Sequence, residues 1–195
     1  MKKLIYILIA LAILVAAYFI YTNFGGQGSI EAVKISDDIY MITNEDVNVA
    51  KNEPVRLSGL DNYPISTHIS YDYDGGILES YPAQAGVKNV KVLSEKLKGY
   101  TAEINSAIRV VDVMQGNIEL IDVREVDEFE EKHIEKAKNI PLGELEQRAA
   151  NEIRKDVTVF VYCRSGNRSK TAQNILENLG YFVIDIGGII DYNQQ

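Results

Sequence analysis

The chain has 195 residues, a formal net charge of -8, one cysteine and no tryptophan. With 46% apolar and 25% charged residues, its composition is that of a globular protein, which excludes wholesale disorder. The acidic balance, 28 acidic against 20 basic side chains, argues against nucleic acid as a partner, because binding phosphates needs a basic face. A single cysteine excludes an intramolecular disulfide and CxxC-type metal or redox sites, so the thiol serves packing, an intermolecular link or chemistry.

The N-terminal segment is predicted to enter the membrane. Residues 4–21 carry no charge and approach the length that a helix needs to cross a hydrocarbon core of about 30 Å. Lys2 and Lys3 favour a cytoplasmic N-terminus, and aromatic residues gather at the far end of the segment. We therefore expect a transmembrane signal-anchor at residues 1–24 in a single-pass protein of the cell membrane, with the C-terminal domain extracytoplasmic. The alternative is a signal peptide cleaved near Ala17, which also exports the rest of the chain.

Residues 25–100 are predicted to form a linker and an extracytoplasmic, mainly β segment whose function the sequence does not indicate. Residues 39–42 and 63–73 have β-type patterns, and Asp-Gly-Gly at 74–76 is predicted to form a hairpin turn. A short helix is expected at residues 90–97. Four tyrosines are expected in the core of this segment rather than on a binding face: Tyr63, Tyr71, Tyr73 and Tyr81.

From residue 101 to residue 195 the pattern changes to alternating strands and helices. Strands are predicted at 101–104, 118–123, 157–162 and 181–186, with a brief extended piece at 139–141. Helices are predicted at 105–114, 125–132, 142–153 and 169–179. This alternation indicates an α/β fold with a parallel sheet covered by helices on both faces. Such sheets bind ligands at the carboxyl ends of their strands.

One such strand end carries a candidate site. A short loop there joins the strongest predicted strand to a helix, and its residues share the ability to hold an anion: Cys163, Arg164, Ser165, Gly166, Asn167, Arg168 and Ser169. The Gly-Asn pair tolerates a tight turn that points backbone N–H groups inward, toward the positive end of the following helix. The two arginines add positive charge and the two serines add hydrogen-bond donors. A thiol in that field is expected to be largely ionised near neutral pH and therefore nucleophilic.

The sequence leaves two non-catalytic roles open for the cysteine. A cysteine after a buried strand is commonly a small hydrophobic core residue, and an exported protein can use a lone thiol for an intermolecular disulfide. The flanking arginines, the Gly-Asn turn and the helix start favour chemistry. The two histidines, His68 and His133, give no clear sign of a cysteine–histidine dyad. No motif for a metal or another cofactor is present.

Several short motifs of the C-terminal half occur in a characteristic order. They are Leu120-Ile121-Asp122-Val123-Arg124, Glu128-Phe129, His133-Ile134, Asn139-Ile140-Pro141, the stretch from Val161 to Ser169, Leu179-Gly180-Tyr181 and Gly187-Gly188-Ile189. Together they make residues 101–195 resemble a rhodanese-like domain. Glu135-Lys136 stands where that family usually has Pro-Gly, and Tyr192 where a tryptophan is frequent.

The resemblance implies a sulfurtransferase without a cofactor. The Cys163 thiolate would take sulfane sulfur from a small-molecule donor such as thiosulfate, hold it as a persulfide, and pass it to a thiol or cyanide-like acceptor. Asp122 and Arg124 would support the active-site region, although a purely structural ion pair is the simpler interpretation. The alternative from another class is a non-catalytic binding or sulfur-sensing module. Phosphatase or arsenate reductase chemistry is disfavoured, because the related phosphatases have a loop one residue longer than Cys163 to Arg168.

Overall fold

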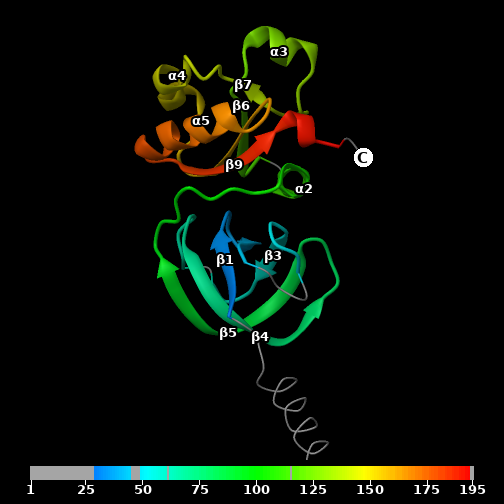
Figure 1. Ribbon diagram of the computed structural model, residues 1–195. Coiled ribbons are helices and arrows are strands. Elements are labelled where there is room, and N and C mark those ends of the chain that lie inside the picture. The colour runs from blue at the N-terminus through cyan, green and yellow to red at the C-terminus, as the bar shows by residue number, and fades with distance from the viewer. Residues whose placement is uncertain (1–28, 45–48, 61, 115, 194–195) are drawn as a thin grey trace, which may run out of the picture.

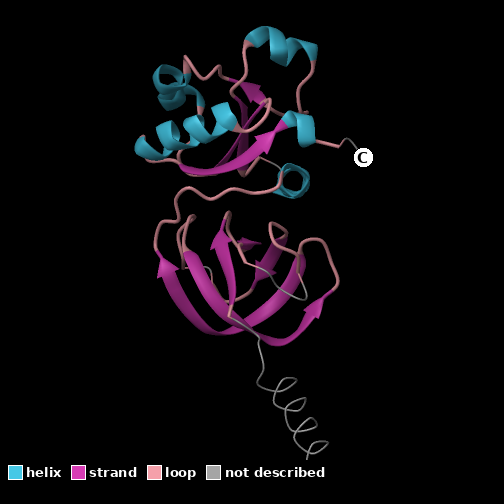
Figure 2. Cartoon of the chain, viewed as in Figure 1, coloured by secondary structure: helices cyan, strands magenta, loops and turns pink. Residues whose placement is uncertain are grey.

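A computed structural model describes residues 29–44, 49–60, 62–114 and 116–193 (Figures 1 and 2). These residues form a β-barrel followed by a parallel sheet with its helices. The predicted membrane segment at residues 4–21 and most of the predicted linker lie outside the described ranges. Within those ranges, no helix combines the length and the apolar character that crossing a membrane requires.

The barrel is built from residues 30–94. Its five strands are β1 (Ile30–Lys34), β2 (Ile39–Ile42), β3 (Pro54–Leu57), β4 (His68–Leu78) and β5 (Ala83–Ser94). They follow the order β1-β2-β3-β5-β4, and β4 pairs with β1 to close the barrel. The pairing of β3 with β5 is parallel, whereas the other pairs are antiparallel. Closure leaves no open sheet edge, which explains how so short a segment folds around its own core.

Two local predictions in the barrel are wrong, and both segments lie in strands that contain β-bulges. Residues 90–97 are not a helix, since β5 runs through Ser94 and pairs with β4 up to that residue. A bulge near Asn89 (φ 53°) leaves Val87 and Val90 packed against the same core. The Asp-Gly-Gly at residues 74–76 is not a hairpin turn either. It lies inside β4, where two extra residues between Tyr73 and Ile77 bend the strand around the barrel.

The four tyrosines of this segment occupy different environments. Tyr71 is fully buried in the barrel core, and its ring meets that of Tyr73 edge-on with a centroid distance of 5.5 Å. Tyr63 and Tyr73 are partly buried against the same core, while Tyr81 is 49% exposed. Three of the four therefore contribute to the core, and the four do not share one binding face.

The second unit is a four-stranded parallel sheet in the order β7-β6-β8-β9. Its strands are β6 (Ile118–Asp122), β7 (Lys138–Asn139), β8 (Thr158–Cys163) and β9 (Phe182–Gly188). Its helices are α2 (Ile104–Met114), α3 (Val126–Glu131), α4 (Leu145–Glu152), α5 (Asn167–Asn178) and the 3-10 turn η1 (Ile189–Asp191). The predicted strand at residues 101–104 is wrong, because only Thr101 forms an isolated bridge, to Asp185, before α2 begins.

Side chains of the central strand β8 alternate between two buried faces. Phe160 and Tyr162 point to the side of α2, whereas Val159, Val161 and Cys163 point to the side of α4 and α5. Every residue of β8 is buried, as expected for a parallel strand covered on both faces. The predicted α/β architecture is therefore confirmed, with the cysteine at the carboxyl end of a central strand.

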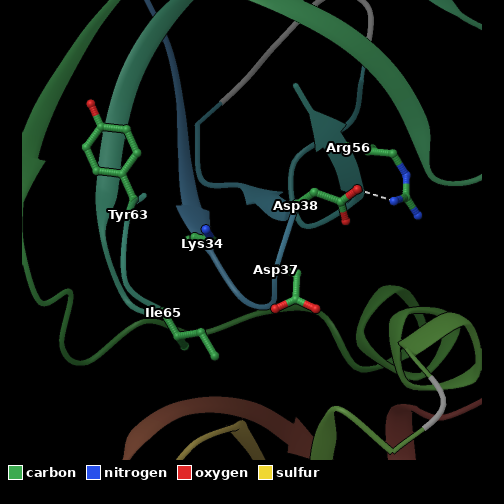
Figure 3. Close-up of a pocket in the computed structure, with 6 residues that line it drawn as sticks. All are labelled: Lys34, Asp37, Asp38, Arg56, Tyr63 and Ile65. Atoms are coloured by element: carbon green, nitrogen blue, oxygen red, sulfur yellow. Dashed lines mark hydrogen bonds and ion pairs between the residues drawn. The ribbon is translucent and has the colours of Figure 1, made fainter. Parts of the chain in front are cut away.

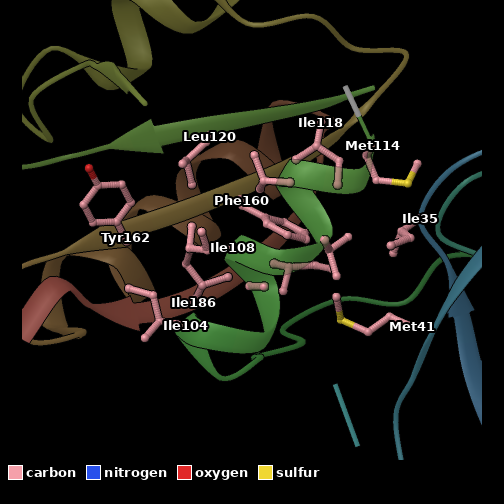
Figure 4. Close-up of a cluster of buried hydrophobic side chains, with 14 of the residues drawn as sticks. Ile35, Met41, Ile104, Ile108, Met114, Ile118, Leu120, Phe160, Tyr162 and Ile186 are labelled. Carbon is pink, nitrogen blue, oxygen red and sulfur yellow. The ribbon is translucent and has the colours of Figure 1, made fainter. Parts of the chain in front are cut away.

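One of the hydrophobic clusters contains residues of both the barrel and the sheet. Ile35 and Met41 of the barrel belong to the same buried cluster as α2 and the near face of the sheet (Figure 4). The buried Thr158 hydroxyl at the start of β8 donates to the carbonyl of Ile35 at 2.6 Å. The barrel thus supplies part of the cover that the α2 face of the sheet needs.

A cavity of about 570 Å³ opens at one end of the barrel, and it does not include Cys163 (Figure 3). Its walls carry charges of both signs, and Asp38 and Arg56 form an ion pair there. Residues from the barrel and its loops line it: Lys34, Asp37, Asp38, Arg56, Tyr63 and Ile65.

Candidate active site

Cys163 is the last residue of β8, which lies between β6 and β9 in the sheet. Its side chain is 1% exposed and packs on the α5 side. A loop of three residues separates it from the first residue of α5, Asn167. The loop therefore lies at the carboxyl end of the sheet, the position at which open α/β sheets bind ligands.

The sulfur of Cys163 lies among polar groups of the loop. The backbone N–H of Gly166 donates a hydrogen bond to Sγ at 3.1 Å, and the Ser169 hydroxyl lies 3.8 Å from Sγ. Gly166 is the N-cap of α5 and has a φ of 95°, a left-handed conformation that glycine adopts at little cost. The positive end of the α5 dipole therefore lies close to the sulfur. Both features stabilise negative charge on the sulfur or on an anion beside it.

The end of β9 packs against the backbone of the loop. One extra residue in β9, at Gly187 (φ 83°), shifts the register so that Gly188 pairs with Cys163. A Cβ on Gly188 would lie 2.5 Å from the Arg164 carbonyl oxygen and 2.6 Å from the Ser165 Cα, so the two backbones are in direct contact. The backbone N–H of Ile190 also donates to the Arg164 carbonyl at 3.2 Å. The loop thus depends on a position that accepts only glycine.

The Ser169 side chain ties the loop to the same part of β9. Its hydroxyl oxygen lies 2.9 Å from the carbonyl oxygen of Gly166 and 3.3 Å from that of Gly187. The Gly187 N–H in turn donates to the Asp185 carboxylate at 2.9 Å. Ser169 is fully buried, so its place in the candidate site is to hold the loop.

The two loop arginines differ in their surroundings. Arg168 donates two parallel hydrogen bonds to the Glu128 carboxylate of α3, at 2.6 and 2.9 Å. These bonds lower the pKa of Glu128 to about 2, so the carboxylate is ionised at neutral pH. Arg164 is exposed and forms no ion pair with any residue in the described ranges. Both arginines were expected to add positive charge at the loop, and in the structure the charge of Arg168 is paired with a carboxylate. Ser165 and Asn167 are exposed beside Arg164.

Asp122 and Arg124 form a buried ion pair at the end of β6. The Asp122 side chain is fully buried, and Arg124 donates to its two oxygens at 2.7 to 3.0 Å. Arg124 also donates to the Lys132 carbonyl at 2.5 Å, and Asn139 donates to the carbonyls of Asp122 and Arg124. The pair therefore anchors the segment that carries α3, with no direct hydrogen bond to Cys163.

Neither histidine forms a hydrogen bond with Cys163. His68 belongs to the barrel, where its Nε2 lies 2.9 Å from the Thr43 hydroxyl and burial lowers its pKa. His133 stacks on Phe129 with a centroid distance of 3.9 Å, and its Nδ1 lies 2.9 Å from the Phe129 carbonyl oxygen. The described residues thus pair the cysteine with backbone and hydroxyl groups.

Comparison with known proteins identifies the domain that carries this loop. A family model described as "Rhodanese-like domain" matches residues 109–194. The thiosulfate sulfurtransferase PspE of Escherichia coli (strain K12) is 41% identical over 73 residues, which are 36% of this chain and 70% of PspE. The chain belongs to the rhodanese family. Its relatives include proteins that are named as sulfurtransferases, in agreement with the resemblance seen in the motifs.

Two further proteins are similar to part of the chain. The uncharacterized protein YqhL of Bacillus subtilis (strain 168) is 52% identical over 61 residues, 31% of this chain and 48% of YqhL. A solved structure described as "rhodanese with anions from E. coli" is 38% identical, covers 40% of this chain and 94% of that chain, and has a TM-score of 0.37. The chain spans about half the length of YqhL and about a third of that of a further curated relative.

Two parts of the site have roles that the sequence did not reveal. Glu128 appeared only as a motif residue, because its partner Arg168 is 40 residues away in the chain. Gly187 and Gly188 likewise appeared only as a motif, and their glycine pair at a strand end was the available signal of a close backbone approach.

Proposed function

We propose that the protein is a rhodanese-type sulfurtransferase in which Cys163 carries the sulfur atom. The observation that supports this most directly is the position of Sγ, which accepts a hydrogen bond from the Gly166 N–H at the start of α5. That arrangement stabilises a thiolate before the reaction and an anionic persulfide after it.

In the first half-reaction, the Cys163 thiolate attacks the outer sulfur of thiosulfate. A new S–S bond forms to Cys163 while the S–S bond of thiosulfate breaks, and sulfite leaves with the electron pair. In the second half-reaction, an acceptor such as cyanide attacks the terminal sulfur of the persulfide. Thiocyanate leaves, and the thiolate of Cys163 is restored without a net redox change or a cofactor.

The surrounding residues take separate parts in this reaction. Arg164 is exposed at the loop, and its positive charge attracts the anionic donor. The Gly166 amide stabilises the charge on sulfur, while Ser169 and Gly188 hold the loop in shape. Since no second cysteine is present, the persulfide has to be discharged to another molecule.

The test is transfer of sulfur from thiosulfate to cyanide by the full chain purified in mild detergent, followed as thiocyanate formation. We expect activity in the wild type and none in Cys163→Ser. Asp112→Asn, which removes an exposed carboxylate on α2, serves as a matched surface control that keeps its activity. Activity that survives in Cys163→Ser, with its circular dichroism unchanged, contradicts the proposal. An aryl phosphate tested in parallel separates sulfur transfer from phosphatase chemistry.

We further propose that the enzyme is a single-pass protein of the cell membrane with its C-terminal domain outside the cytoplasm. The support is the uncharged run at residues 4–21 behind Lys2 and Lys3. Protease added to intact spheroplasts should cut the C-terminal domain, and a domain cut only after lysis contradicts this topology. The size of the mature chain distinguishes an anchor from a cleaved signal peptide.

A further inference from the structure

The contact between Glu128 and Arg168 joins the active-site loop to α3. The two hydrogen bonds, at 2.6 and 2.9 Å, are parallel and lock the guanidinium plane against the carboxylate. The same carboxylate accepts a hydrogen bond from the Glu125 N–H at 3.2 Å, which fixes it to the start of α3. Both side chains are partly buried, at 25% exposure for Glu128 and 30% for Arg168. The pair is therefore a fixed part of the site rather than a loose surface contact.

The pair also changes the charge of the loop. From its sequence alone, the loop carries two positive charges beside the sulfur. The carboxylate of Glu128 cancels one of them at contact distance, so Arg164 is left as the uncompensated loop cation among the described residues. An anion at the loop therefore meets a net charge of about one where the sequence suggests two.

We propose that Glu128 is a positioning residue that acts through Arg168 and limits the affinity of the loop for anions. This inference rests on the proposed function. Thiosulfate and its product sulfite are both dianions that occupy the same loop in succession. A loop with two free arginines would bind thiosulfate and sulfite more tightly. Binding that is strengthened equally for every anion at the loop slows the release of sulfite without lowering the barrier to sulfur transfer. By neutralising the charge of Arg168, Glu128 keeps the release of sulfite fast, while Arg164 still attracts thiosulfate.

The experiment compares the wild type with Glu128→Gln, Arg168→Gln and the double variant in the full chain. The glutamine at 128 keeps an oxygen that accepts a hydrogen bond from Arg168 but removes the negative charge. In Glu128→Gln we expect the KM for thiosulfate and the inhibition constant of sulfite to fall together, roughly three- to tenfold, and the effect to shrink in high salt. In Arg168→Gln both constants should rise, and in the double variant they should return toward the wild type. Asp112→Asn controls for the loss of a carboxylate elsewhere.

A purely structural role predicts a different result. If Glu128 only supports the fold, Glu128→Gln lowers kcat and thermal stability without tightening anion binding, and the double variant is at least as impaired as either single one. Either outcome overturns the inference while leaving the sulfurtransferase assignment intact. Calorimetric titration of sulfite into each variant on the Cys163→Ser background measures anion binding without turnover. It therefore tests Glu128 even if thiosulfate proves not to be a substrate, and equal or undetectable binding in the Glu128→Gln background contradicts the inference.

Discussion

Replacing Gly188 by alanine should displace the candidate active-site loop while leaving the cysteine itself unchanged. The added Cβ would lie 2.5 Å from the Arg164 carbonyl oxygen, 2.6 Å from the Ser165 Cα and 2.9 Å from the Arg164 carbonyl carbon. All three are backbone atoms, so no side chain can turn aside to make room. Restoring an ordinary contact of about 3.4 Å requires the loop or β9 to move by about 1 Å.

Such a movement has consequences of predictable size. Overpacking of this kind typically costs about 1–3 kcal/mol of unfolding free energy, which corresponds to a Tm lower by several degrees. A displacement of about 1 Å at a reacting group lowers the rate by roughly a hundredfold. We therefore expect Gly188→Ala to lose far more kcat/KM in the thiosulfate–cyanide assay than its modest loss of stability explains.

The matched control is Gly143→Ala. Gly143 is exposed, and a Cβ built there meets nothing within 4 Å, so the substitution should leave both activity and Tm unchanged. If Gly188→Ala keeps the wild-type kcat/KM and Tm, the loop does not depend on its contact with β9, and the proposed role of Gly188 is refuted.

Three further predictions concern stability. Met41 is buried in the cluster shared by the barrel and the sheet, and Met41→Ala should lower the free energy of unfolding by about 2–5 kcal/mol in urea titrations. A separate unfolding transition of the barrel that leaves the sheet folded would contradict the shared cluster. Arg124→Met leaves the Asp122 carboxylate buried and unpaired, and should cost about 3–5 kcal/mol by the same measurement; a neutral effect would show that the pair is dispensable. Arg168 lowers the pKa of Glu128 to about 2 from an ordinary 4.5. The ion pair between them therefore stabilises the folded state fully above pH 4.5, and this stabilisation is lost as the pH falls toward 2. The stability gap between wild type and Glu128→Gln should close over that window, and a pH-independent gap would contradict a charge-based contribution.

The conformation of the candidate active-site loop could be predicted from the sequence because the features that shape it are local. An apolar strand, a Gly-Asn turn and a helix start follow one another within a few residues of Cys163, and turn preferences act at that range. The surroundings of the loop depend on contacts between distant segments. Whether Arg168 is free or paired is decided by the placement of Glu128, 40 residues earlier, which follows from the anchoring of α3 by Asp122 and Arg124.

The barrel shows a second reason why sequence patterns do not predict every strand and turn. A β-bulge adds residues to one strand and thereby changes which side chains share a face. The bulge at residues 74–76 gave a strand the composition of a turn, and β5 continues through most of the segment that was predicted to be a helix. Closure through β1 with β4 and β3 with β5 joins segments that no local pattern connects. The covering of α2 by Ile35 and Met41 is likewise a property of the assembled molecule.

The proposed role of Cys163 as the carrier of a sulfur atom is tested most directly by the intact mass of the protein after incubation with thiosulfate under non-reducing conditions. With a single cysteine in the chain, the mass of the whole protein reports on that one thiol. We predict a gain of one sulfur atom, its removal by cyanide with an equal amount of thiocyanate formed, and no gain in Cys163→Ser. An unchanged mass in a folded protein whose thiol still reacts with an alkylating agent would contradict this role.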